Sequence, residues 1–241
     1  MKQVRTLSFL LLLASAVWSS CNKDNNLHLD LGYGYAPSAG DVGRYVIYDV
    51  DSTIYNAFNR DTLHYKYQLK EYLQSVFPDN EGRPSLRIER WVRNYRPGVS
   101  YDSVPWVLKN VWYSTRTLHD YERVEDNIRF VKLIFPDQTQ QTWNGNAQNT
   151  LGDWEYAYNG IDFKFNANGL RFDSTLTVTE LVDTNLLNYQ YYSEQYAKNI
   201  GLVSRQVIDV GDTGIVFGVS VLNRINHGVT CFMTINSYGK Q

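Results

Sequence analysis

The four histidines are the first residues to test for chemistry, because histidine serves as general base, metal ligand and pH switch. They are His28, His64, His119 and His227, and no two of them are close in the chain. Neither H-E-x-x-H nor C-x-x-C occurs, so the sequence predicts no zinc site. There is also no G-x-S-x-G nucleophile turn, no G-x-G-x-x-G turn and no P-loop. We therefore expect no catalytic residue, no metal ligand and no cofactor.

Acidic residues gather in one stretch of the chain. The acidic members are Glu122, Glu125 and Asp126, and the basic residues around them are Arg116, Arg123 and Arg129. Two carboxylates held about 5 to 9 Å apart can perform acid–base chemistry. Here the two signs of charge alternate within a polar stretch, which is typical of a solvated, ion-paired surface loop. The stretch is expected to be such a loop.

A second acidic pattern is Asp49-Val50-Asp51, which begins like a calcium-binding loop. The D-x-[DN]-x-[DN]-G pattern needs a third oxygen ligand and then a glycine. Thr53 and Ile54 stand at those two positions. The pattern therefore predicts the solvated end of a strand.

Aromatic side chains are the feature with the greatest binding potential. They are Trp91, Tyr95, Tyr101, Trp106, Trp112, Tyr113, Trp143, Trp154, Tyr156 and Tyr158. Aromatic faces stack on sugars or line apolar pockets, and each ring can instead fill a core by burying about 150 to 250 Å². We expect most of them to lie in the core and two or three to be exposed.

The N-terminus has the layout of a secretory leader. Lys2 and Arg5 precede an apolar stretch, Leu7 to Val17, which is followed by Ser19, Ser20 and Cys21. A membrane-spanning helix needs roughly 20 apolar residues, so this shorter stretch predicts a signal peptide over residues 1–20. Cleavage after Ala16, behind an A-x-A pattern, is the alternative.

Trp18-Ser19-Ser20-Cys21 resembles the lipobox of bacterial lipoproteins at its small residues and at the cysteine, with Trp18 where that family prefers Leu, Val or Ile. The resemblance implies cleavage between Ser20 and Cys21, acylation of Cys21 and anchoring in a lipid bilayer. Residues 22–40 are polar or contain glycine. We expect residues 21–40 to be the lipidated cysteine and a flexible tether.

Several phrases of the remaining chain are similar to an uncharacterised family of Bacteroidota envelope lipoproteins. They are Gly43 to Ser52, Arg87 to Arg90, Val124 to Pro136, Trp143 to Ala147 and Tyr196 to Val203, the last of which contains the "IGLV" sequence of β-rich envelope lipoproteins. The resemblance implies a palmitate-bearing protein of the outer membrane, on its periplasmic side or at the cell surface. No activity is known to us for the family.

Composition fits an exported, globular protein. The net charge is −2 and no basic stripe is present, which argues against a nucleic-acid partner. Cys231 is the second of only two cysteines. It lies in an apolar run, so we expect a buried, inert thiol and no internal disulfide.

The body of the chain has the alternation of β-strands. Leu63 to Lys70 alternates apolar and polar residues, and Leu86 to Arg93 does so until a slip at Arg90-Trp91 that predicts a bulge. Further candidate strands are 129–135, 162–165, 174–180, 188–193, 202–210, 214–222 and 229–236. The pattern predicts one all-β domain over residues 41–241. It is expected to be a mainly antiparallel meander whose curved sheet forms a barrel, half-barrel or sandwich, with at most one short helix. The one candidate for that helix is 192–199, for which a strand is the preferred interpretation.

Three functions stay open on the sequence. The first is a non-enzymatic binding or structural module anchored in the envelope, whose partner is a glycan, a peptide or an envelope protein. The second is a lipid or lipoprotein carrier with an apolar cavity. The third is a hydrolase, which would need a cleft holding titratable side chains with perturbed pKa values.

Overall fold

Apolar and polar residues alternate along much of this chain. In a β-strand successive side chains point to opposite faces of the sheet, so this alternation favours strands with one buried face. The structure is a computed structural model that describes residues 30–59 and 61–241. The chain divides at Asp30, and Leu31–Gln241 is one compact unit. The predicted leader and Cys21 lie outside the described residues. Within the described part, no helix is both long and apolar enough to span a bilayer.

The described chain contains twelve strands in a single sheet. They are β1 (Arg44–Tyr55), β2 (Thr62–Pro78), β3 (Pro84–Asn94), β4 (Val107–Arg116), β5 (Asp120–Glu125), β6 (Ile128–Ile134), β7 (Thr142–Asn144), β8 (Glu155–Ala167), β9 (Leu170–Thr184), β10 (Asn188–Ala197), β11 (Gly201–Gly211) and β12 (His227–Lys240). Within residues 30–59 and 61–241, helical structure is limited to four 3₁₀ turns: η1 (Tyr33–Tyr35), η2 (Ala39–Asp41), η3 (Tyr101–Ser103) and η4 (Val221–Asn223). The predicted all-β class is confirmed.

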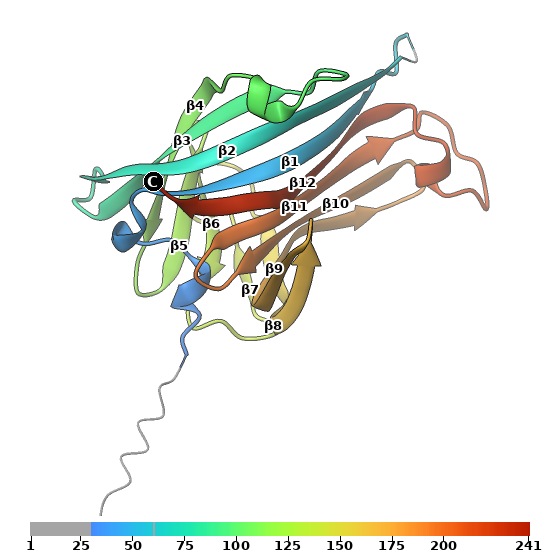
Figure 1. Ribbon diagram of the computed structural model, residues 1–241. Coiled ribbons are helices and arrows are strands. Elements are labelled where there is room, and N and C mark those ends of the chain that lie inside the picture. The colour runs from blue at the N-terminus through green and yellow to red at the C-terminus, as the bar shows by residue number, and fades with distance from the viewer. Residues whose placement is uncertain (1–29, 60) are drawn as a thin grey trace, which may run out of the picture. The chain divides into compact units, whose positions relative to one another are not determined.

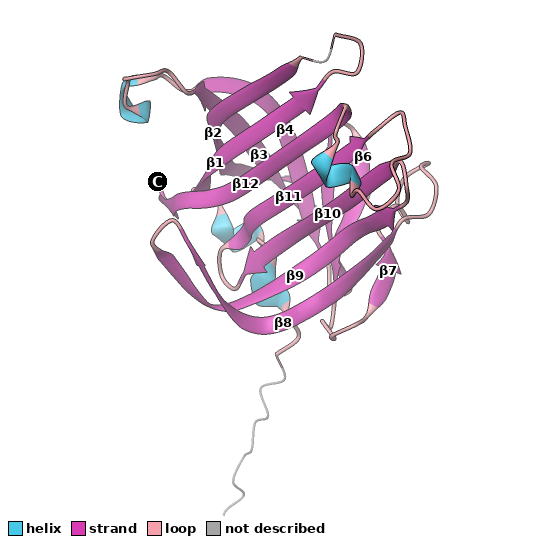
Figure 2. Ribbon diagram, turned by 90° about the vertical axis from the view of Figure 1, so that its right-hand side faces the viewer, coloured by secondary structure: helices cyan, strands magenta, loops and turns pink. Residues whose placement is uncertain are grey.

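The sheet is two meanders joined by the chain's first and last strands. Its order is β6-β5-β4-β3-β2-β1-β12-β11-β10-β9-β8-β7, and each strand pairs antiparallel with its neighbours. Figure 1 shows β12 beside β1 in the middle of a strongly curved sheet. Figure 2 shows the same sheet wrapping around toward β7 and β8.

Curvature brings the two sheet edges, β6 and β7–β8, together into a nearly closed barrel. The backbone N–H of Val131 donates to the carbonyl of Gly145 at 2.9 Å, and the Trp143 indole donates to the carbonyl of Val131 at 2.8 Å. The Tyr158 hydroxyl accepts from the Ile134 N–H at 2.9 Å and donates to the Ile134 carbonyl at 2.8 Å. The two edges of the sheet are therefore joined by these individual hydrogen bonds and not by a continuous ladder of backbone hydrogen bonds.

Large side chains and paired charges fill the inside of the barrel. Tyr48, Tyr156, Tyr158 and Tyr196 are each 1% exposed or less. Among them lie four acids and four bases, listed here as Glu71, Glu125, Glu180, Glu194, Arg90, Arg123, Lys132 and Arg205. We call these eight residues the interior ion network. Each acid of the network forms an ion pair with at least one of its bases. Such pairing is what allows charged side chains to be buried.

Three expectations from the sequence need correction. Residues 31–40 are not tether, because they belong to the compact unit: Tyr35 is 2% exposed and its hydroxyl bonds Ser174 at 2.7 Å. The candidate strand at 214–222 is a loop that contains η4. The Asp49-Val50-Asp51 segment is not the end of a strand, because it lies inside β1. In addition, strands β4, β5 and β7 were not expected. The slip at Arg90-Trp91 does coincide with a register shift in the pairing of β3 with β4.

Candidate ligand-binding groove on the outer face

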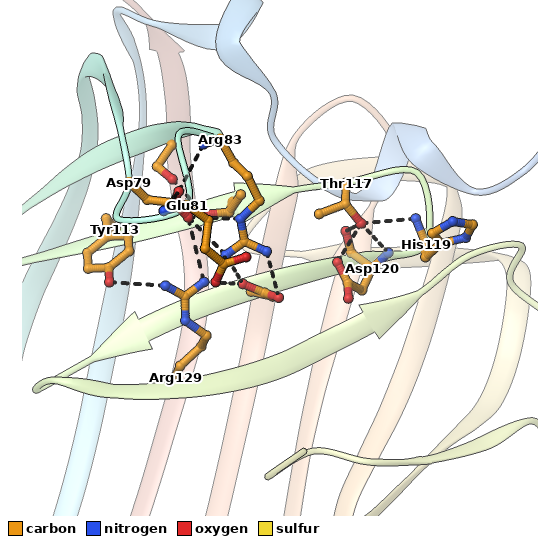
Figure 3. Close-up of polar contacts among 11 residues, drawn as sticks. Asp79, Glu81, Arg83, Tyr113, Thr117, His119, Asp120 and Arg129 are labelled. Carbon is orange, nitrogen blue, oxygen red and sulfur yellow. Dashed lines mark hydrogen bonds and ion pairs between the residues drawn. The ribbon is translucent and has the colours of Figure 1, made fainter. Parts of the chain in front are cut away.

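The acidic stretch predicted to be a solvated loop is instead strand β5, and that expectation is wrong. Glu122 and Arg123 are 2% and 3% exposed. The Glu122 side chain faces outward. Its carboxylate forms an ion pair with Arg83 at 2.9 Å and a second one with Arg129. Figure 3 shows Arg83 and Arg129 converging beside Asp79, with Arg129 also reaching the Tyr113 hydroxyl.

The next residues of that stretch point into the barrel. Arg123 donates to Glu71 at 2.8 Å, and Glu125 pairs with Arg205 at 3.3 Å. Burial alone would raise the pKa of Glu125, but the Lys132, Arg205 and Arg123 charges hold it well below its usual value. Asp126 stays exposed and accepts from the Trp112 indole at 3.1 Å. The stretch therefore joins two structural ion networks and offers no open acid–base pair.

The histidines lie apart from one another. His64 bonds Thr53 at 3.0 Å and His227 bonds Asn226 at 2.8 Å, both through Nδ1. His119 is exposed in the β4–β5 turn, where its backbone N–H donates to Thr117 (Figure 3). His28 lies outside the described residues. In the described part of the chain, no group of three or more His, Cys, Asp or Glu side chains could hold a metal ion.

Cys231 occupies the concave side of β12 and is a half-buried free thiol. Burial raises the pKa of this thiol above its usual value. A raised thiol pKa lowers the thiolate fraction at neutral pH, and the thiolate is the reactive form. The predicted inert character of Cys231 agrees with this environment.

The aromatic residues divide between the core and the surface. Tyr156 and Tyr158 are fully buried and Trp112 is 6% exposed, whereas Tyr95 is 50% exposed. Tyr101 and Tyr95 both lie on the loop between β3 and β4, with ring centroids 6.2 Å apart. These two rings form one wall of a groove on the outer face of the sheet.

We call this groove the tyrosine groove, and it has a volume of about 540 Å³. Its lining comprises Asp49, Val50, Asp51, Lys66, Tyr67, Gln68, Tyr95, Tyr101, Asn168, Phe232, Thr234 and Asn236. The floor follows from strand register, because Asp49 stands opposite Gln68 on β2 and Thr234 on β12. Residues two apart on one strand share a face, which adds Asp51 and Phe232. Asn168, from the β8–β9 turn, lies on the other side.

Asp49 is the polar centre of the groove. One carboxylate oxygen accepts from Gln68 at 2.8 Å, and the other accepts from Asn236 at 2.8 Å and Asn168 at 3.3 Å. These bonds fix three amide side chains in defined orientations. The Asn236 side chain uses one of its two N–H donors here, so its second N–H and its carbonyl oxygen can serve a ligand.

Weakly held groups complete the lining. Asp51 pairs with Lys66 at 3.1 Å, and both side chains are at least half exposed. Such a pair contributes little to stability and can exchange its partner for a ligand hydroxyl. Phe232 is 41% exposed and supplies an apolar surface on the floor. Size, aromatic rings and a few fixed polar groups are the usual attributes of a small-molecule site.

Ordered contacts hold the loop that carries Tyr95 and Tyr101. Val104, a residue of this loop, is buried, and Arg93 on β3 bonds both Gln68 at 2.8 Å and Asp102 at 3.1 Å. The Ser100 hydroxyl accepts from the N–H of Asp102 at the start of η3. The groove wall is therefore preformed. Sequence patterns indicated which residues could bind, but not that strands β1, β2 and β12 and two turns would bring them together.

Comparison with known proteins finds a weak structural likeness. No protein-family model and no curated protein matches the chain. A solved structure from Bacteroides fragilis, of a protein inferred to be exported and assigned a YmcC-like fold, aligns with a TM-score of 0.42 at 10% identity. The alignment covers 83% of this chain and 96% of that chain. A relationship at this level carries no argument about function, so the resemblance to Bacteroidota lipoproteins stays a prediction.

Proposed function

We propose that this protein is a non-enzymatic binding module of the cell envelope and that it holds a saccharide in the tyrosine groove. The observation that carries the proposal is the pairing of the exposed Tyr95 ring and the half-buried Tyr101 ring with a fixed carboxylate–amide cluster on one open surface. Sugar rings present C–H faces that pack on aromatic rings. Their hydroxyls donate to carboxylates and exchange hydrogen bonds with amides, so the groove offers both contacts at once.

The binding test uses full-length protein, a panel of neutral oligosaccharides and isothermal titration calorimetry. Replacing Tyr95 and Tyr101 together by Ala is expected to weaken binding at least about tenfold, equal to about 1.4 kcal/mol, because both stacking faces are removed. Tyr65→Ala is the matched control, since Tyr65 is 46% exposed on the concave side of β2. Equal weakening by the control, or binding of peptides in place of sugars, would overturn the saccharide assignment.

Anchoring at the envelope is the second part of the proposal, and it rests on the leader and Cys21. Cys21→Ser is expected to abolish incorporation of labelled palmitate and to release the protein from the membrane fraction, because serine provides no thiol for the thioether-linked lipid. Fractionation of expressing cells with and without the substitution measures this. Membrane retention of the unlabelled variant would contradict lipid anchoring.

The carrier and hydrolase alternatives lack support of this kind. A cavity lined in part by Glu71 and Arg123 has a volume of only about 40 Å³, which is room for a few water molecules, in a charged setting that would penalise an acyl chain. A second hollow on the concave side has a volume of about 360 Å³, but its wall carries the Lys109 and Asn94 side chains, and it is open to solvent. The interior carboxylates Glu180 and Glu194 are each 2% exposed, so a substrate could not reach them without opening the barrel.

A further inference from the structure

A second feature of the outer face lies next to the tyrosine groove. Lys70 on β2 has its ammonium 5.7 Å from the ring centroid of Trp91 and 5.1 Å from that of Trp106. The guanidinium of Arg93 lies 4.4 Å from the Trp106 ring and 5.6 Å from the Tyr101 ring. We call Lys70, Trp91, Arg93 and Trp106 the cation–indole ladder.

The ladder is continuous with the groove. Asp49, Gln68 and Arg93 stand opposite one another across β1, β2 and β3, and Gln68 bonds both of the others. Strands lie about 4.8 Å apart, so the row from Asp49 to Arg93 spans about 10 Å. Lys70 is two residues beyond Gln68 on the same face and stands opposite Trp91. A chain of sugar units lying in the groove would therefore extend onto the ladder.

Positive charge on the ladder is incompletely balanced. Lys70 forms no ion pair with any of the residues that the structure describes. Arg93 pairs with Asp102, whose side chain is 90% exposed, so water screens that partner strongly. Partial burial and the nearby Arg93 charge lower the pKa of Lys70 below its usual value, and the Glu89 carboxylate offsets them only in part. An anion beside Lys70 would offset both effects.

We propose that the cation–indole ladder is a subsite for the carboxylate of an acidic sugar, so that the ligand of the groove is an acidic oligosaccharide. The proposal rests on the saccharide function proposed above. The Trp91 and Trp106 rings provide stacking surface for the sugar, and Lys70 provides a charge-assisted hydrogen bond to its carboxylate. The groove alone carries the Asp49 and Asp51 carboxylates beside the single Lys66 ammonium, so without the ladder it would not favour acidic sugars.

The test compares acidic oligomers with their carboxyl-reduced counterparts by calorimetry, using full-length protein and galacturonate, mannuronate and glucuronate oligomers. At least one acidic oligomer is expected to bind about tenfold more tightly than its reduced form at about 10 mM salt. That preference is expected to shrink at about 1 M salt, where the Debye length falls from about 30 Å to about 3 Å. Lys70→Met is expected to remove the preference while leaving affinity for the reduced oligomer within about twofold.

Lys109→Met is the matched control. Like Lys70, Lys109 holds its ammonium over an aromatic ring, 5.7 Å from the Tyr67 centroid, but it lies on the concave side of the sheet. It should leave the preference intact. Equal affinity for acidic and reduced oligomers would overturn the ladder subsite and leave the groove standing. Persistence of the preference in Lys70→Met would overturn the role of Lys70. Binding of neither form would overturn the saccharide function together with its subsite.

Discussion

Replacing Lys132 by Met is expected to lower the free energy of unfolding by roughly 3 to 5 kcal/mol at neutral pH, the usual cost of leaving a buried charge uncompensated. The Lys132 ammonium lies 2.6 Å from Glu180 and 3.2 Å from Glu194, and all three side chains are 2% exposed or less. Methionine keeps much of the side-chain volume but removes the charge between two buried carboxylates. Urea denaturation at pH 7, followed by tryptophan fluorescence, measures the loss.

Lys66→Met is the matched control, because Lys66 forms an ion pair with Asp51 in which both side chains are at least half exposed. Loss of an exposed pair of this kind costs under about 1 kcal/mol. Combining Lys132→Met with Glu180→Gln and Glu194→Gln should recover part of the stability, since the repelling carboxylates are then neutral. A Lys132 variant no less stable than the Lys66 control would mean that water reaches Glu180 and Glu194.

Local alternation was enough to predict the fold class and most strands. It failed at 214–222, where the residues are as apolar as those of a strand. The reason is the absence of a neighbour: pairing of β11 with β12 stops at Gly211 and His227, so the residues between them form the connecting loop. Arg224 then fixes that loop by bonding Asp212 at 2.7 Å and the carbonyl of Val219 at 3.3 Å.

The charged strand β5 could not be recognised for a different reason. A run that mixes Glu, Arg and Asp is usually solvated, and only the partners of Glu122 and Arg123 reveal otherwise. Those partners are 39 and 52 residues away in sequence, at Arg83 and Glu71. Curvature of the sheet brings these partners together, Glu122 with Arg83 on the outer face and Arg123 with Glu71 in the interior, and no local pattern encodes that.

For the tyrosine groove too, the sequence predicted some of the residue types but not which residues the fold brings together. The two tyrosines of the β3–β4 loop, Tyr95 and Tyr101, were among the aromatic candidates from the start. The Asp49 cluster was not foreseen, because Asn168 and Asn236 are 119 and 187 residues from Asp49. The sequence therefore indicated that stacking surface was available, whereas the polar half of the site required the fold.

Glu194 and Glu180 share Lys132 yet are expected to respond differently to the same substitution. Burial would raise the pKa of Glu194, but Lys132 and Arg205 bring it below its usual value. For Glu180, burial and the neighbouring charge of Glu194 raise the pKa despite Lys132. Removing the charge of Glu194 loses an interaction that favours the ionised form, so Glu194→Gln should cost roughly 2 to 3 kcal/mol at pH 7, and Glu180→Gln should cost less.

The pH dependence follows from the directions of these shifts. A carboxyl with a lowered folded pKa contributes stability above its unfolded pKa of about 4.3, and this contribution is lost as pH falls through the folded value. The cost of Glu194→Gln should therefore shrink on acidification. The pKa of Glu180 is shifted in the opposite direction, upward. Ionisation of this carboxyl therefore lowers the stability of the folded protein as the pH rises through the pKa of Glu180 in the folded state. Urea titrations of both variants at pH 7 and at a pH below about 4 measure the two effects. Equal, pH-independent costs would show that Lys132 and Arg205 do not distinguish the two acids.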